Sequence, residues 1–213
     1  MSQPRISEST VRRLSVYLRL LRELEGEDRE IVSSKELATR SGTTPAQVRK
    51  DLSLFGSFGK RGRGYTVPDL AETLEEILGL ERRWRVALVG VGRIGGALLG
   101  YRDLRERGFD VVAALDVDPA KVGTEVEGMR IEAMDRLEEI VRERGVEMGV
   151  VAVPPDTAQP VADRLVDAGV RALLNFAPVK LDVGEDAVVR SMDVALEMEG
   201  LSFALSHGDG DGR

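Results

Sequence analysis

The sequence has no cysteine and a single histidine, His207, among its 213 residues. The absence of cysteine excludes disulfides, thiolate nucleophiles and cysteine-ligated metal. One histidine near the C-terminus cannot form a metal cluster, so we expect no metal site. No apolar run approaches the ~20 residues that cross a bilayer, and the N-terminus lacks the apolar core of a signal peptide. We therefore expect a cytoplasmic protein with no membrane partner.

Acidic residues outnumber basic ones overall, but positive charge is concentrated near the N-terminus. The net charge is −7, yet residues 1–70 carry +4 and the remainder carries −11. Residues 40–66 have a charge of +5, with Asp51 as the only acidic residue among them. Such a split between halves indicates different partners for each. An anionic polymer is expected to bind the basic segment.

The N-terminal segment has the pattern of a helix-turn-helix over about residues 14–55. A helix at 9–25 has one apolar stripe. Ser33 and Thr44 each begin a capping box, with Gln47 completing the second and Pro45 at the first helical position. The second helix of such a pair enters the major groove, although an ordinary helical bundle remains the alternative for this segment alone. The candidate DNA contacts on this helix are Thr44, Gln47, Arg49, Lys50 and Ser53.

The segment at about 56–67 alternates glycine with bulky or basic residues and closes with Tyr65-Thr66-Val67. This composition predicts a hairpin wing, whose tip would place cations on phosphates or in the narrow minor groove. A solvated basic loop is the alternative. The wing cations are Lys60, Arg61 and Arg63. Residues 1–80 are thus predicted to form a winged-helix DNA-binding domain.

A glycine motif follows an apolar, strand-like run that begins at Val86. Gly90, Gly92 and Gly95 have the spacing of a dinucleotide-binding turn. The first allows the tight turn, the second lets backbone approach a pyrophosphate, and the third lets helix and strand pack closely. The backbone of the turn and the start of the following helix would face the phosphates. This adds Val91, Arg93 and Ile94 to the candidate cofactor contacts.

A second strand, Val111–Leu115, ends at Asp116, whose carboxylate is placed to bind the adenosine ribose. A carboxylate there repels a 2′-phosphate, which favours NAD(H) over NADP(H). Val117 follows as a further candidate contact. Lys121 lies close enough to reach a phosphate, and a solvated lysine is an equal alternative.

Strands then alternate with helices through residues 81–190, which predicts a doubly wound, Rossmann-type parallel sheet and an α/β fold. Ligands bind beyond the carboxyl ends of such strands. Pro154, Phe176, Ala177 and Pro178 follow two of these ends and are predicted to wall the nicotinamide, with plain turn residues as the alternative. Residues 191–213 form an amphipathic helix and a polar tail. This helix packs either on its own domain or on a second subunit.

Hydride transfer to a substrate needs a general acid or base beside the nicotinamide. Residues 81–190 contain no histidine or cysteine, and no spacing supports Lys180 or Tyr101 in that role. We therefore expect cofactor binding without catalytic residues. An NAD-dependent oxidoreductase with a fused basic DNA-binding domain is the main alternative, and a nucleotide- or acyl-CoA-binding subunit of an enzyme is a weaker one.

Together these motifs resemble the Rex family of redox-sensing transcriptional repressors over nearly the whole chain. The resemblance rests on Val48-Arg-Lys-Asp-Leu52, Phe55-Gly, Gly62-x-Gly64-Tyr65, the three glycines, Asp116-x-Asp118, Lys121-x-Gly123 and Asn175-Phe-Ala-Pro178. It implies a homodimer that binds palindromic operator DNA with NAD⁺ and releases it with NADH. It also implies a C-terminal helix that swaps between subunits, and a redox-dependent contact among Arg19, Tyr101 and Asp193. Tyr101 is also a candidate cofactor contact. Many relatives carry asparagine where this chain has Arg93, which affects one local contact.

NAD⁺ and NADH differ by one positive charge on the nicotinamide. An apolar, dry pocket rimmed by Phe176, Ala177 and Pro178 would favour the neutral reduced ring, because burying an unpaired charge is costly. The sequence thus predicts a sensor in which the reduced cofactor is the preferred ligand.

Overall fold

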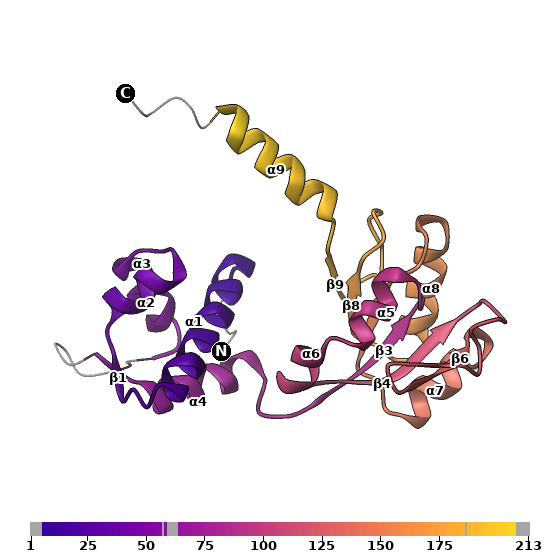
Figure 1. Cartoon of the computed structure of the whole chain (residues 1–213), viewed down its shortest axis with the longest axis horizontal. Coiled ribbons are helices and arrows are strands. Elements are labelled where there is room, and N and C mark those ends of the chain that lie inside the picture. Colours follow the sequence, from indigo (N-terminus) through magenta and orange to yellow (C-terminus); the bar gives the residue numbers. More distant parts are fainter. Residues whose placement is uncertain (1–5, 57, 59–63, 186, 208–213) are drawn as a thin grey trace. The chain divides into compact units, whose positions relative to one another are not determined.

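The structure is a computed structural model that describes residues 6–56, 58, 64–185 and 187–207. The chain divides into two compact units, Met1–Arg82 and Arg83–Arg213. Figure 1 shows a mainly helical first unit and a second unit built on a sheet. Each unit has its own hydrophobic core.

In the described part of the N-terminal unit, four helices share one apolar core. Ser7 caps the first helix by accepting the backbone N–H of Thr10. Gly42, in the left-handed conformation at φ +68°, ends the second helix and forms the turn to the third. The helices are α1 (Glu8–Gly26), α2 (Ser34–Ser41), α3 (Pro45–Ser53) and α4 (Val67–Leu78). The predicted helix-turn-helix therefore corresponds to α2 and α3.

A short antiparallel ladder joins β1 (Ile31–Val32) to β2 (Tyr65–Thr66). The sequence did not indicate β1, because two residues are too few to show a period. The expected strand also extended to Val67, which instead begins α4. Gly64 has φ +85°, and a Cβ there would lie 2.6 Å from the carbonyl oxygen of Val32. Glycine is thus required where the chain returns to pair with β1.

The C-terminal unit is organised around a seven-stranded sheet in the order β5-β6-β4-β3-β7-β8-β9. All neighbours are parallel except β5, which pairs antiparallel with β6 at one edge. The six parallel strands, numbered along the chain, have the order 3-2-1-4-5-6 of the doubly wound dinucleotide fold. The strands are β3 (Trp84–Val89), β4 (Phe109–Asp116), β5 (Glu125–Val126), β6 (Met129–Ala133), β7 (Met148–Val151), β8 (Ala172–Asn175) and β9 (Val188–Ser191).

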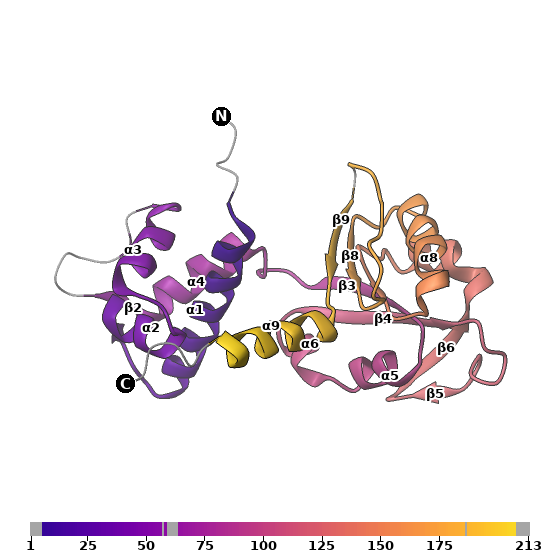
Figure 2. The same cartoon turned by 90° about the horizontal axis from the view of Figure 1, so that it is seen from above.

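Helices cover both faces of this sheet. On one face α7 (Leu137–Glu143), preceded by the 3-10 turn Met134–Arg136, and α8 (Pro155–Asp167) bury a core against alternate residues of β3 and β4. On the other face α5 (Arg93–Leu99) packs over Val86 and Leu88. Figure 2 shows β3 and β4 between α8 and α5. A short helix, α6 (Arg102–Glu106), precedes β4.

The C-terminal segment differs from its prediction at the start. We expected the amphipathic helix from residue 191, but residues 188–191 form β9, which adds a parallel strand beside β8. The helix α9 begins later and spans Val194–His207. None of its residues is buried, and its large apolar side chains are between 59% and 81% exposed.

Candidate functional site

The glycine turn connects β3 to α5 at the point where the strand order reverses, since β3 lies between β4 and β7. The N–H of Gly90 donates to the carbonyl of Leu115 at 2.8 Å, and the N–H of Ala152 donates to the carbonyl of Val89 at 2.8 Å. The turn is therefore fixed by hydrogen bonds to both neighbouring strand ends. Ligands of doubly wound folds bind at this switch point.

Two of the three glycines are required by the protein itself. Gly90 has φ +94°, and a Cβ there would collide with the carbonyl oxygen of Ala152. A Cβ at Gly95 would collide with the carbonyl oxygen of Gly90 and would lie 3.1 Å from the Leu88 side chain. Gly95 thus allows α5 to pack directly on the turn, which is the role expected from the spacing.

Gly92 is different, because nothing in the described chain demands glycine there. Its φ is −86°, an ordinary extended conformation, and a Cβ would meet no atom within 4 Å. The space beside its Cα is open. A glycine that the protein's own packing does not require is expected where a ligand must approach the backbone closely, as a pyrophosphate does in this fold. The turn therefore fits the dinucleotide that the spacing predicts.

Asp116 fixes the same turn from the end of β4. The residue is 7% exposed. Its Oδ2 accepts the N–H of Val91 at 2.8 Å and the ammonium of Lys121 at 3.0 Å, and its Oδ1 accepts the N–H of Asp118 at 2.9 Å. Burial opposes ionisation, but these three donors hold the pKa of Asp116 below its usual value. Lys121 is thus an ion-pair partner of Asp116, an arrangement that sequence reasoning did not consider.

The other candidate cofactor contacts lie at the same edge of the sheet. Val117, Pro154 and Phe176 follow the carboxyl ends of β4, β7 and β8, which meet at one edge because the strands are parallel. Val117 is 79% exposed and Ile94 is 50% exposed. Arg93 is exposed at the start of α5. Exposed apolar side chains beside the turn are suited to a flat organic ring.

The loop after β8 is shaped by Asn175, which is fully buried. Its amide nitrogen donates to the carbonyls of Ala177 at 3.0 Å and Val179 at 2.8 Å, and its amide oxygen accepts the N–H of Ala177 at 2.9 Å. The sequence motif around Asn175 does not by itself indicate this role. Pro178 is exposed and Phe176 is half-buried, but Ala177 is 4% exposed and packs in the core beneath α8. Phe176 and Pro178 are therefore the more exposed apolar side chains at the start of this loop, and the nicotinamide wall stays a prediction.

The second helix of the helix-turn-helix, α3, begins as expected. Thr44 caps it by accepting the N–H of Gln47 at 3.1 Å, and Pro45 occupies the first turn. Its exposed face carries Arg49 and Lys50, and the Arg49 guanidinium donates to the hydroxyl of Ser34 at 3.1 Å. The hydroxyl of Ser53 donates to the carbonyl of Lys50.

The predicted capping box at Thr44 is only half formed. The Gln47 side chain does not return to the Thr44 backbone, and instead donates to Asp51 Oδ1 at 2.8 Å. Asp51 is 1% exposed, so it is not part of the exposed basic surface of this segment.

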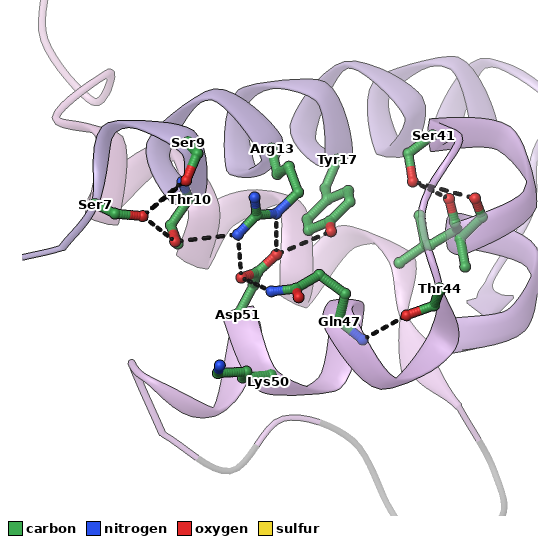
Figure 3. A network of polar contacts seen from close by, with 12 residues as sticks. Ser7, Ser9, Thr10, Arg13, Tyr17, Ser41, Thr44, Gln47, Lys50 and Asp51 are labelled. Atoms are coloured by element: carbon green, nitrogen blue, oxygen red, sulfur yellow. Dashed lines mark hydrogen bonds and ion pairs between the residues drawn. The ribbon is translucent and has the colours of Figure 1, made fainter. Parts of the chain in front are cut away.

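Asp51 lies at the centre of a polar cluster that joins α3 to α1, as Figure 3 shows. Arg13 forms a two-pronged ion pair with it, with Nε 2.6 Å from Oδ2 and Nη2 2.7 Å from Oδ1. The Tyr17 hydroxyl donates to Oδ2 at 3.1 Å, and Thr10 accepts from Arg13. Burial opposes ionisation of Asp51, but the donors Arg13, Gln47 and Tyr17 hold its pKa below the usual value. Sequence patterns did not reveal this cluster, because Arg13 and Asp51 lie far apart in the chain.

The predicted wing cations Lys60, Arg61 and Arg63 lie outside the described residues. The remaining candidates have local partners. Arg19 lies 4.0 Å from Glu23, and the Tyr101 hydroxyl donates to Asp103 at 3.3 Å. Asp193 accepts the N–H groups of Ala195 and Leu196 and thereby caps α9.

The described residues show neither a metal-binding cluster nor a membrane-spanning helix. No group of three or more histidine, cysteine, aspartate or glutamate side chains is placed to hold a metal ion. Within the same residues, no helix combines the length and apolar character needed to cross a membrane.

The first unit contains a helix-turn-helix, and the second is a doubly wound fold whose glycine turn is open to a ligand. These features define a DNA-binding protein with a nucleotide-binding domain. Comparison with known proteins agrees with both parts. Residues 5–53 match the family described as putative DNA-binding protein N-terminus, and residues 81–179 match the family described as CoA binding domain. The chain belongs to the Rex family of redox-sensing transcriptional repressors.

The relatives cover nearly the whole chain. The redox-sensing transcriptional repressor Rex of Syntrophomonas wolfei is 46% identical over 95% of this chain and 96% of its own length. The Rex of Carboxydothermus hydrogenoformans is 47% identical over 94% of this chain and 97% of its own. Among solved structures, the Rex-family repressor RSP in complex with β-NAD⁺ and operator DNA is 32% identical, with a TM-score of 0.91 over 97% of this chain and 95% of RSP.

Proposed function

We propose that this chain represses transcription as a homodimer that binds palindromic operator DNA and releases it when NADH binds at the glycine turn. The observation that carries the proposal is that one chain joins both units and aligns along 97% of its length with RSP. RSP has been solved with β-NAD⁺ and operator DNA, and also with β-NADH, at TM-scores of 0.91 and 0.86 to this chain.

The dinucleotide binds along the carboxyl edge of the sheet. Its pyrophosphate lies against Gly92, whose open side supports a close backbone approach. A carboxylate offers about four acceptor sites, and Asp116 uses three of them within the protein. The fourth is available to a hydroxyl of the adenosine ribose. Because the carboxylate repels a 2′-phosphate, the site takes NAD(H) in preference to NADP(H).

Discrimination between the two redox forms takes place at the nicotinamide. The half-buried Phe176 and the exposed Pro178 present apolar surface beyond β8, on a loop that Asn175 holds rigidly. An apolar surface disfavours the charged ring of NAD⁺. A ligand shifts a two-state equilibrium only through such a difference in affinity, and about 1.4 kcal/mol corresponds to a tenfold shift.

The homodimer supplies the element that switches. Helix α9 exposes Leu196, Leu201 and Phe203 by 59% to 65%, which favours burial against a second copy of the chain. Exchange of α9 between subunits brings two heads into one assembly, whose separation must match about 34–36 Å along the duplex or a multiple of it. Arg19, Tyr101 and Asp193 exchange their local partners for one another between the two redox states.

The protein binds the cofactor without consuming it. The relatives that match the whole chain are repressors by name. The chain has no cysteine, and its single histidine, His207, stands in α9 and not at the sheet edge. A second candidate is a CoA-binding protein, because residues 81–179 match the CoA binding domain family.

One gel-shift series tests the proposal. Full-length protein is bound to a palindromic duplex selected from a random pool, and NADH, NAD⁺ or CoA is added. We expect NADH alone to release the duplex. Release by CoA, or no response to NADH, would contradict the proposal.

Absorbance of reduced nicotinamide during a substrate screen tests the oxidoreductase alternative, and any turnover would favour it.

Two variants test the switch. Sedimentation of the full chain is expected to give a dimer, and Leu201→Asp in α9 is expected to give monomers. Asp193→Ala is expected to bind the duplex but to lose the response to NADH. An NADH response equal to that of the unchanged protein would remove Asp193 from the switch.

A further inference from the structure

The amide group of Gln47 has a fixed orientation on α3. Gln47 is the third residue of the helix, in the N-terminal part that contacts base edges in helix-turn-helix proteins. Its Nε2 lies 2.8 Å from Asp51 Oδ1. Figure 3 shows the amide oxygen of Gln47 pointing away from the cluster around Asp51. Within the described residues no donor contacts that oxygen.

The orientation cannot be reversed without cost, because Asp51 only accepts hydrogen bonds. Each of its two carboxylate oxygens already accepts from Arg13, and Oδ2 also accepts from Tyr17. An ionised carboxylate has no proton to donate. A turned Gln47 amide would therefore place oxygen against oxygen at a buried site.

We propose that Asp51 is a positioning residue that presents Gln47 to the major groove as a single acceptor, which reads an exocyclic base amine, N6 of adenine or N4 of cytosine. The usual pairing of glutamine with adenine uses the amide oxygen and nitrogen together, on N6 and N7. That pairing would require Nε2 to leave Asp51. The inference rests on the proposed DNA-binding function.

The neighbouring side chains make this acceptor distinct. Arg49 and Lys50, the cations on the exposed face of α3, can only donate. They suit phosphates and the acceptor edge of guanine. Gln47 adds the complementary group, so the helix can recognise both donors and acceptors. If Gln47 served only to join α3 to Asp51, the effect of a base change on DNA affinity would be the same with and without the Gln47 side chain.

Base analogues in the duplex separate the two modes of contact. A duplex selected by the full-length protein from a random pool is scanned one base pair at a time with the unchanged protein and with Gln47→Ala. The pair at which discrimination falls in Gln47→Ala is the pair that Gln47 reads. At an adenine, purine removes the N6 amine, and 7-deazaadenine removes only N7. At a cytosine, 2-pyrimidinone removes the N4 amine.

We expect loss of the amine to weaken binding about fivefold, as for one hydrogen bond, and loss of N7 to have no effect. Asp51→Asn is expected to lower the sensitivity to amine loss at this pair only. Lys50→Ala is the matched control, which lowers affinity but keeps the analogue pattern at this pair.

Several results would overturn the inference while leaving the proposed function intact. These are an equal loss with 7-deazaadenine, an unchanged affinity after amine removal, no base pair that depends on Gln47, or an unchanged analogue pattern in a folded Asp51→Asn protein. If Asp51→Asn does not fold, the analogues still decide with the unchanged protein. Failure of the unchanged protein to select any duplex would overturn the proposed function as well.

Discussion

Among the residues that the structure describes, each unit has one buried aspartate, which ties two segments together. Asp51 in the N-terminal unit is 1% exposed, and Asp116 in the C-terminal unit is 7% exposed. Both have a pKa below the ordinary value of 3.8, although burial alone would raise it. The two carboxylates differ in the source of their donors. Asp51 is bound by three side chains, and Asp116 by two backbone N–H groups and one lysine.

This difference separates a site that holds helices together from a site that holds a turn for a ligand. The partners of Asp51 lie largely inside the unit, so removing one leaves a charge without compensation. The backbone donors of Asp116 cannot be removed by substitution, and the Lys121 side chain is 38% exposed and can turn to water. We therefore expect the N-terminal unit to be more sensitive to loss of a charged partner.

The largest effect is expected for Arg13→Ala, which leaves the Asp51 carboxylate buried with its side chain 2% exposed. The free energy of unfolding of the N-terminal unit should fall by about 3–5 kcal/mol, as for other broken buried pairs. Urea unfolding followed by circular dichroism measures it. Arg29→Ala is the control, because its pair with Glu36 is 46% and 28% exposed and should contribute about 1 kcal/mol or less. Equal losses in the two variants would contradict the prediction.

Asp116→Asn tests the other carboxylate. Both of its oxygens accept backbone N–H groups, so an asparagine must turn its own NH₂ toward one of those donors. We expect a loss of about 1–3 kcal/mol in the C-terminal unit and weaker NADH binding, measured by urea unfolding and by fluorescence titration. Lys121→Met removes the partly exposed ion-pair partner of Asp116. It should lower the free energy of unfolding by about 1 kcal/mol or less. A larger cost for Lys121→Met would show that the ion pair, not the turn, is the main role of Asp116.

Tyr17→Phe removes one hydrogen bond to Asp51 and should cost about 1 kcal/mol at neutral pH. Burial, together with the bond to Asp51, raises the pKa of Tyr17 from 10.0 to about 12. The folded pKa is the higher one, so this stabilisation is complete below pH 10 and is lost as the pH rises toward about 12. The difference in the free energy of unfolding between the unchanged protein and Tyr17→Phe should therefore shrink as the pH rises from 10.0 to about 12. A difference that is constant with pH would contradict the assignment.

Acid should affect both units through the two aspartates. A carboxyl whose folded pKa is lowered stabilises the fold above its ordinary value of 3.8 and loses that contribution as the pH falls below it. Chemical shifts of the two side-chain carboxyls during an acid titration test the direction of each pKa.

The sequence predicted what depends on local pattern. The caps at Ser33 and Thr44, the glycine turn and the carboxylate at the end of β4 follow from spacing, because each forms between residues close in the chain or on neighbouring strands. The cluster of Arg13 with Asp51 did not follow, since it joins residues 38 positions apart. The sequence reading also missed β9, which lies after the irregular stretch that follows β8.

The candidate site shows the same limit. Spacing identified Asp116, but its bonds to Val91 and Lys121 depend on how the loop after β4 folds back. The place after a strand predicts that Ala177 lies at the sheet edge, but it does not predict that Asn175 bonds both backbone groups of Ala177 or that Ala177 packs in the core.

The smallest effect on stability is expected for Gly92→Ala. This variant tests whether Gly92 is needed for ligand binding and not for the fold. The backbone there has φ −86°, and a Cβ would meet no atom within 4 Å. An alanine that fits without strain usually stabilises by about 0.4–1 kcal/mol, because it restricts the unfolded chain. NADH, however, should bind at least about tenfold more weakly, a loss of about 1.4 kcal/mol, since the methyl group occupies the space that the pyrophosphate needs.

Gly95→Ala is the control in the same turn. Its methyl group collides with the carbonyl of Gly90, so stability and binding should fall together. If Gly92→Ala binds NADH as tightly as the unchanged protein, the open side of the turn is not where the cofactor lies.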